Sequence, residues 1–184
     1  MRAIAATVIA CLLTLRGIQI AVAQEVENIT LEAVVVDSNA SVDSKFELKD
    51  HRGKTIVLHF LLKTECPFCL KYTHQYAKLA ATTPDVIHLF IKPDSEDEIH
   101  SWISQLAKTG AAKFPAIYQD PGAKLAKRFG IPDGYRFHGQ TVHYPALVVL
   151  NGDGKEIFRY VGKSNSDRMP IEKFVEKLES MTAK

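Results

Sequence analysis

The sequence has few cysteines, a single tryptophan and no apolar run long enough to span a membrane. It contains 3 Cys and 1 Trp among 184 residues, whereas a membrane span needs ~20 consecutive apolar residues. Its 23 basic and 21 acidic residues nearly balance, and no dense Lys/Arg cluster occurs. These absences argue against a disulfide-rich scaffold, a transmembrane protein and a nucleic-acid-binding protein.

Residues 1–23 have the pattern of a secretory signal peptide. Arg2 precedes an apolar stretch over residues 3–15, and Ala21-Val22-Ala23 forms a small-residue cleavage site. Cleavage near Ala23 would leave a periplasmic or otherwise exported protein without stable membrane insertion. It would also remove Cys11, so that the mature chain keeps only two thiols.

Those two thiols belong to the stretch around which the chain is organised. Residues 55–62 are aliphatic and β-branched on both alternating faces, which is typical of a strand buried in a parallel sheet. Cys66-Pro67-Phe68-Cys69 follows. Helical spacing starts there, and Pro67 suits a first helical position, where its missing N–H leaves no partner unsatisfied.

A Cys-x-x-Cys pair at the start of a helix predicts redox chemistry. Unpaired N–H groups and the helix dipole favour a thiolate, which is the nucleophilic form of cysteine. Cys66 is therefore the candidate nucleophile, and Cys69, one turn later, is the candidate resolving thiol. A structural zinc site would need four ligands, so we expect neither a metal nor another cofactor.

The rest of the chain alternates strand and helix patterns. Strands are expected over residues 29–36, 45–48, 86–91, 114–118, 146–150 and 156–161, helices from Ser95, over 123–129 and near the C-terminus, and a loop over 132–143. Ser95 and Glu98 form a capping-box pattern. We predict an α/β fold with a central mixed sheet flanked by helices, in which residues 24–44 form an N-terminal β extension and residues 45–184 one domain.

The segments TIVLHFLLKTECPFC and YPALVVLNGDGKEIFRYVG, followed by a C-terminal helix, resemble the thioredoxin superfamily. The resemblance is greatest to its exported TlpA-like members and to the AhpC/TSA peroxiredoxin relatives, including a βα insertion before the proline strand. It implies that Pro145, preceded by Tyr144, is the cis-proline that faces the redox cysteines and holds an extended substrate. It also implies substrate contacts from Pro67, Phe68 and Tyr144.

His59 lies seven residues before Cys66 on the predicted central strand. In thioredoxin relatives a buried polar residue usually stands six residues before the first cysteine and moves the proton of the second. His59 is therefore a candidate proton relay, and the alternative is a histidine satisfied within the core.

The resemblance leaves two enzymatic functions open. The first is a thiol-disulfide oxidoreductase acting on protein disulfides and recharged by a membrane-bound or exported thiol reductant. The second is a thiol peroxidase. Peroxiredoxins carry a threonine three residues before the reactive cysteine and a distant arginine, whereas here Lys63 takes that place and Thr64 lies one position off. Arg128, Arg136 and Arg159 are available arginines, but none lies in a matching motif.

A non-enzymatic copper carrier resembling the Sco group is a third alternative. That group spaces its cysteines one residue farther apart and adds a histidine, so the Cys-x-x-Cys spacing argues against it.

Overall fold

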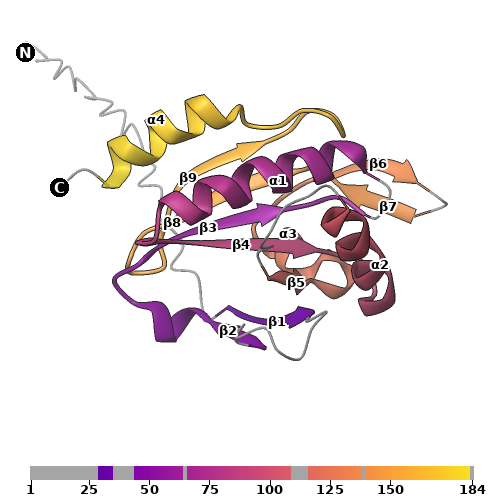
Figure 1. Ribbon diagram of the computed structural model, residues 1–184, viewed down its shortest axis with the longest axis horizontal. Coiled ribbons are helices and arrows are strands. Elements are labelled where there is room, and N and C mark those ends of the chain that lie inside the picture. The colour runs from indigo at the N-terminus through magenta and orange to yellow at the C-terminus, as the bar shows by residue number, and fades with distance from the viewer. Residues whose placement is uncertain (1–28, 35–43, 64–65, 109–115, 138–139, 183–184) are drawn as a thin grey trace, which may run out of the picture.

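The computed structural model describes residues 29–34, 44–63, 66–108, 116–137 and 140–182. Its centre is a mixed sheet with the strand order β2-β1-β5-β4-β3-β8-β9 (Figure 1). These strands are β1 (Thr30–Val34), β2 (Lys45–Glu47), β3 (Thr55–Phe60), β4 (Val86–Lys92), β5 (Ile117–Gln119), β8 (Ala146–Leu150) and β9 (Glu156–Val161). Strands β3, β4 and β5 run parallel, and the other neighbours are antiparallel. The predicted α/β fold is confirmed.

Helices cover both faces of this sheet. They are α1 (Pro67–Thr82), α2 (Glu96–Ala107), α3 (Lys124–Arg128) and α4 (Ile171–Thr182), joined by the 3-10 turns η1 (Leu48–His51) and η2 (Pro121–Ala123). Helices α1 and α4 lie on the same side of the sheet (Figure 1). The predicted capping box starts α2, because the Ser95 side chain accepts from the Glu98 N–H and Glu98 accepts from the Ser95 N–H.

The alternation of side chains along β3 divides the core in two. Val57 packs in the layer shared with α1, α2 and α4, whereas Ile56 and Leu58 pack in the layer that includes α3 and the β1–β2 pair. Both layers are apolar, so β3 is buried on both faces, as its sequence predicted. The cysteines follow this buried strand in the chain, and both pack in the same layer as Val57.

The structure differs from the sequence prediction between residues 132 and 143. A loop was predicted, but β6 (Asp133–Phe137) and β7 (Gln140–His143) form an antiparallel pair of their own. Tyr135 pairs with Val142 in the register, and both pack against the core. Glycine and polar residues interrupt the alternation in this segment, which is why it looked like a loop.

The segment predicted as an N-terminal extension contributes to the same sheet. Strand β1 pairs with β2 on one side and with β5 on the other. The signal peptide, its cleavage site and Cys11 lie outside the described residues. Among the described residues, no helix combines the length and the apolar character required to cross a membrane.

Candidate active site

Cys66 lies at the junction predicted from the sequence, between β3 and α1. It is the N-cap of α1, where its Sγ accepts a hydrogen bond from the Cys69 N–H at 3.2 Å, and Pro67 begins the helix. The Cys66 carbonyl also accepts from the Cys69 and Leu70 N–H groups. The first turn of α1 therefore directs the Cys69 N–H at Cys66 Sγ, where it would stabilise negative charge on that sulfur.

The two thiols are reduced in this structure and differ in accessibility. Cys66 is 9% exposed, whereas Cys69 is fully buried. Both sulfurs are therefore buried, and Cys66 is the more exposed of the two. The roles predicted from the sequence, with Cys66 attacking and Cys69 resolving, stay predictions.

A cation that the sequence analysis missed contacts both sulfurs. Nη2 of Arg168 donates to Cys69 Sγ at 3.2 Å and lies 3.6 Å from Cys66 Sγ. The guanidinium also lies 5.9 Å from the ring centroid of Tyr72. Arg168 stands in the segment before α4, 102 positions after Cys66. No spacing motif connects it to the cysteines.

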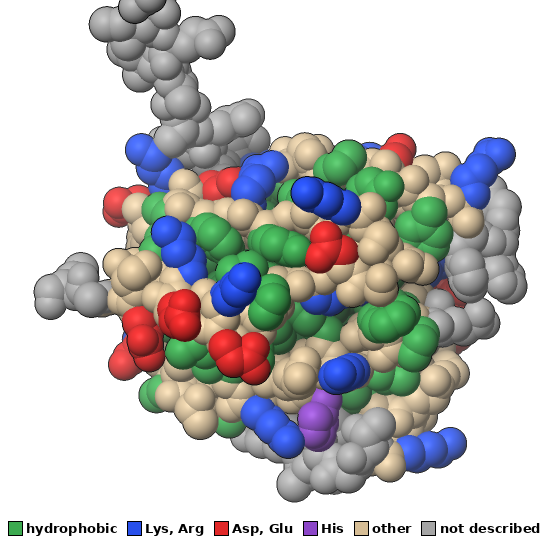
Figure 2. All heavy atoms as spheres, turned by 90° about the horizontal axis from the view of Figure 1, so that it is seen from above, with side chains coloured by type: hydrophobic (Ala, Val, Ile, Leu, Met, Phe, Trp, Pro, Cys, Tyr) green, Lys and Arg blue, Asp and Glu red, His purple; other side chains and the backbone are tan. Residues whose placement is uncertain are grey.

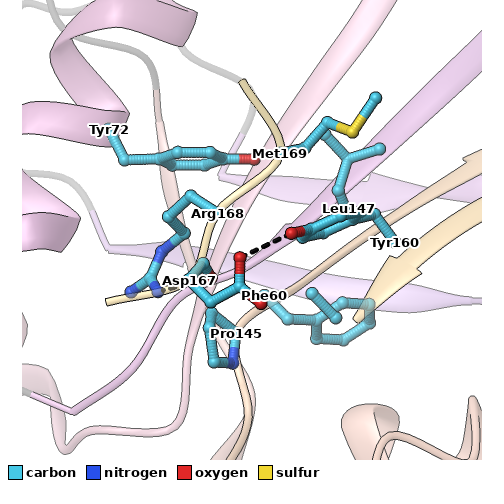
Figure 3. A pocket seen from close by; sticks show the side chains of 9 residues that line it. Phe60, Tyr72, Pro145, Leu147, Tyr160, Asp167, Arg168 and Met169 are labelled. Carbon is cyan, nitrogen blue, oxygen red and sulfur yellow. Dashed lines mark hydrogen bonds between the residues drawn. The ribbon is translucent and has the colours of Figure 1, made fainter. Parts of the chain in front are cut away.

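The segment that carries Arg168 is fixed by hydrogen bonds and by close packing. Asp167 accepts a hydrogen bond from the Tyr160 hydroxyl (Figure 3). It also accepts one from the Lys163 N–H. Nη1 of Arg168 donates to the carbonyls of Asn165 and Asp167. A Cβ at Gly162 would lie 2.5 Å from the Asp167 carbonyl oxygen, so only glycine allows this approach.

The environment of the thiol pair favours a single thiolate. Burial opposes ionisation of Cys69, but the hydrogen bond from the Cys66 thiol and the charges of Arg168 and Lys92 outweigh it and lower the pKa of Cys69 to about 6. The hydrogen bond to Cys69 and burial raise the pKa of Cys66. The reduced pair therefore holds one proton between two sulfurs near neutral pH.

Lys92, at the end of β4, is a fully buried second cation. Its Nζ donates to the Leu62 carbonyl at 2.6 Å and lies 3.3 Å from Asp94 Oδ2. It also lies 4.7 Å from the ring centroid of Trp102. Burying a lysine is costly unless it is paired and hydrogen-bonded, and these contacts supply both. Lys92 thus adds positive potential at Cys69 from within the core.

The expectation that Pro145 is a cis-proline is wrong. No peptide bond among the described residues is cis, so the bond between Tyr144 and Pro145 is trans, which is the lower-energy form of most X–Pro bonds. Pro145 nevertheless lines the same small pocket as Tyr72 and Arg168 (Figure 3). Its carbonyl accepts from the Gly162 N–H, which ties it to the segment that carries Arg168.

Phe68 and Tyr144, which were also predicted to contact substrate, differ in what surrounds their rings. The Phe68 side chain is 49% exposed beside the cysteines. The Tyr144 ring lies against Gly134, where a Cβ would come within 2.8 Å of it. Tyr135 belongs to β6. Burial, and then the charges of Cys66 and Cys69, raise the pKa of Tyr135 to about 12.

His59 is fully buried on β3. Its Nδ1 lies 3.2 Å from the Tyr72 hydroxyl and its Nε2 lies 3.0 Å from Nδ1 of His88. Burial and the neighbouring His88 lower its pKa. Both ring nitrogens thus have partners other than the cysteines, and the role of proton relay stays a prediction.

Of the arginines considered from the sequence, Arg159 forms an ion pair with Glu156. The arginine at the thiols is Arg168. Among the described residues, no group of three or more His, Cys, Asp or Glu side chains is arranged to hold a metal ion.

The sequence matches the model of the AhpC/TSA family over residues 22–156. A search of curated proteins found no match. The matched range includes both cysteines and Pro145 but ends before Arg168.

Solved structures with the same fold include both redox classes considered above. An exposed lipoprotein thioredoxin of Streptococcus pneumoniae has 20% identity and a TM-score of 0.61, covering 83% of this chain and 98% of that one. AhpC of Enterococcus faecalis has 18% identity and a TM-score of 0.70, covering 86% and 90%. A secreted disulfide oxidoreductase of Mycobacterium tuberculosis, homologous to Escherichia coli DsbE, has 18% identity and a TM-score of 0.58, covering 83% and 95%. At these identities the likeness concerns the fold.

Proposed function

Because the chain belongs to the AhpC/TSA family and carries two reduced cysteines one helical turn apart, we propose that it is a thiol-disulfide oxidoreductase acting on protein disulfides. The observation that carries the proposal is the contact of one guanidinium with both sulfurs, at 3.2 and 3.6 Å. A cation shared in this way stabilises negative charge on either sulfur. Thiol-disulfide exchange needs such charge first on one sulfur and then on the other.

The reaction begins with a proton shift between the two sulfurs. The reduced pair holds one proton and one negative charge between its two sulfurs. Transfer of this proton from Cys66 to Cys69 creates a thiolate on the more exposed sulfur. Both sulfurs stay beside Arg168, so the charge moves without leaving its counter-ion.

Two exchange steps then follow, the first at the substrate disulfide and the second at the mixed disulfide on Cys66. The Cys66 thiolate attacks one sulfur of the substrate disulfide, forms a mixed disulfide and releases the other sulfur as a thiolate, which takes up a proton. Cys69 then loses its proton and attacks the Cys66 sulfur. The Cys66–Cys69 disulfide forms and the substrate leaves with two thiols, so that two electrons have passed to it.

A thiol peroxidase is the second candidate, and Arg168 is the observation in its favour. In peroxiredoxins an arginine polarises the peroxide, and here an arginine lies 3.6 Å from Cys66 Sγ. Two features favour protein disulfides instead. The guanidinium lies closer to Cys69 than to Cys66, and Lys63, which forms an ion pair with Glu98, stands where peroxiredoxins have threonine.

The two candidates are separated by one paired assay on the chain from Gln24 onward. Insulin disulfide reduction and hydrogen peroxide consumption are measured with the same dithiol donor, with Cys66→Ser as the inactive control. The proposal predicts insulin reduction that the control lacks. Fast peroxide turnover with negligible insulin reduction would overturn the proposal in favour of the peroxidase.

Export and recharging belong to the same proposal. We propose that the chain is cleaved after Ala23 and acts outside the cytosol, where a membrane-bound or exported thiol reductant returns the pair to the dithiol form. Edman sequencing of the protein recovered from an exporting host tests the cleavage, and Gln24 is the expected first residue. A cytosolic product that begins at Met1 would contradict it.

A further inference from the structure

A groove lies beside the redox pair on the side of α1 that faces α4. It has a volume of about 230 Å³ and runs between the first turns of α1 and residues 166–172. Its apolar lining includes Phe68, Met169 and Pro170, and Arg168 links it to the sulfurs. The groove shares Tyr72, Arg168 and Met169 with the small pocket beside Pro145, and Phe68 is one of the substrate contacts that the family resemblance implies.

The volume of the groove suits one large apolar side chain. A cavity of ~150 Å³ accommodates a benzene molecule, and this groove offers about 230 Å³. Phe68, one of its walls, is 49% exposed, which leaves an aromatic ring in water beside the nucleophile. Figure 2, which looks onto the side that carries α4, shows hydrophobic side chains exposed among charged side chains of both signs.

The charges of the groove favour an acidic neighbour for that side chain. Lys71 and Arg168 line it together with a single acidic residue, Glu172. At rest the thiolate of the cysteine pair balances Arg168. The mixed disulfide consumes this thiolate, so the groove becomes more positive at the step in which the substrate is held covalently.

We propose that this groove binds the segment of a substrate protein next to its reactive cysteine, and that it selects an aromatic or branched aliphatic residue beside an acidic one. The inference rests on the proposed disulfide reductase function and adds the class of substrate to it. The apolar side chain enters between Phe68 and Pro170, and the carboxylate faces Lys71 and Arg168.

Reduction of matched peptide disulfides tests this selection. Two short peptides are compared as disulfide-linked dimers, one with Phe-Glu and the other with Ser-Lys after the cysteine. Hydroxyethyl disulfide, which is small and neutral, reports on the exchange chemistry alone. The wild-type protein is expected to reduce the Phe-Glu peptide with a kcat/KM about 10-fold or more above that of the Ser-Lys peptide, a ratio typical of one well-placed apolar contact.

Two variants assign the preference to the groove. Gln75→Trp fills it from α1 and is expected to bring the ratio of the two kcat/KM values close to one. Lys78→Trp adds the same side chain at an exposed position of α1 outside the groove lining and is expected to keep the wild-type ratio. Lys71→Glu reverses one charge and is expected to favour the Ser-Lys peptide relative to wild type, which preserves the test if Gln75→Trp does not fold.

The outcomes separate this inference from the function on which it rests. Equal kcat/KM values for both peptides, with hydroxyethyl disulfide reduced, would overturn the proposed substrate selection by the groove. The proposed function would stay intact. A ratio unchanged in both Gln75→Trp and Lys71→Glu would also overturn the substrate selection. Failure to reduce any of the three disulfides would overturn the proposed function and the groove with it.

Discussion

The Nη2 atom of Arg168 lies 3.2 Å from the Sγ of Cys69, across 99 positions of sequence. This contact brings a positive charge to a thiol that burial alone would keep protonated. It also compensates for Phe68, whose apolar ring cannot stabilise a thiolate from within the Cys-x-x-Cys motif. The redox properties of the pair therefore depend on a residue outside the motif.

Replacing Arg168 with methionine is expected to raise the pKa of Cys69 and to lower the reduction potential. The reduced form loses a charge-assisted hydrogen bond that the disulfide form does not need. A fall on the order of 30 mV corresponds to ~1.4 kcal/mol for a two-electron couple. Equilibration with glutathione measures the potential, and the ultraviolet absorbance of the thiolate measures the pKa.

Arg159→Met is the matched control for this change, because Arg159 pairs with Glu156 on β9. It should leave both values as in the wild type. An unchanged potential in Arg168→Met would show that the contact does not stabilise the thiolate.

The stability of the reduced protein should increase with pH in a defined window. The pKa of Cys69 is about 6 in the folded protein and ~8.5 in an unfolded chain. Between these values the unfolded chain holds the proton and the folded protein does not, so unfolding becomes less favourable as pH rises. This stabilisation is lost as pH falls through about 6.

Urea unfolding of the reduced protein across this window checks the pH dependence. Cys69→Ser provides the reference, because it lacks the titrating thiol. Parallel pH profiles for the two proteins would contradict the lowered pKa.

Lys92→Met is expected to destabilise the fold by about 3–5 kcal/mol, because it removes one partner of a buried ion pair. The double variant Lys92→Met with Asp94→Asn should recover part of this loss, since no buried carboxylate is then deprived of Lys92. Urea unfolding measures the free energy of unfolding of Lys92→Met, of Asp94→Asn and of the double variant. If the double variant were as unstable as the sum of the single variants, the 3.3 Å pair would not couple the two residues.

Gly162→Ala is expected to displace the segment that carries Arg168. The added methyl group would meet the Asp167 carbonyl oxygen at 2.5 Å and Pro145 Cγ at 2.8 Å, and overpacking of this kind costs about 1–3 kcal/mol. The pKa of Cys69 should rise at the same time. Loss of stability with an unchanged thiolate titration would indicate that the segment relaxes without moving Arg168.

His59→Leu tests whether the buried histidine moves protons. The variant leaves the Tyr72 hydroxyl and a ring nitrogen of His88 without their partner, which costs about 1–3 kcal/mol. Since the ring nitrogens of His59 contact those two groups, we expect the pH profile of thiol alkylation to stay as in the wild type. A shifted profile would restore the relay predicted from the sequence.

Strong local patterns made much of the fold predictable. The apolar run before the cysteines, Pro67 at the helix start and the capping box at Ser95 each act within a few residues, and each appears in the structure as predicted. The hairpin of β6 and β7 was missed because its support comes from packing of Tyr135 and Val142 on the core, which local alternation does not reveal.

The site was predictable only where its residues are close in sequence. Cys66 and Cys69 share a helical turn, so their spacing identified them. Arg168 and Lys92 reach the pair from the segment before α4 and from the end of β4, and their contacts depend on the tertiary fold. For Lys92 the sequence offered one signal, which is a lysine at the end of an apolar strand. If such a side chain is buried, it requires a partner.

The most direct test of the account is the trapping of a substrate on single-cysteine variants. Cys69→Ser and Cys66→Ser are each incubated with a disulfide-containing protein, and adducts are located by mass spectrometry after thiol blocking. The account predicts a stable mixed disulfide on Cys66 in Cys69→Ser and negligible adduct in Cys66→Ser. Adducts on Cys69, or none on Cys66, would contradict it.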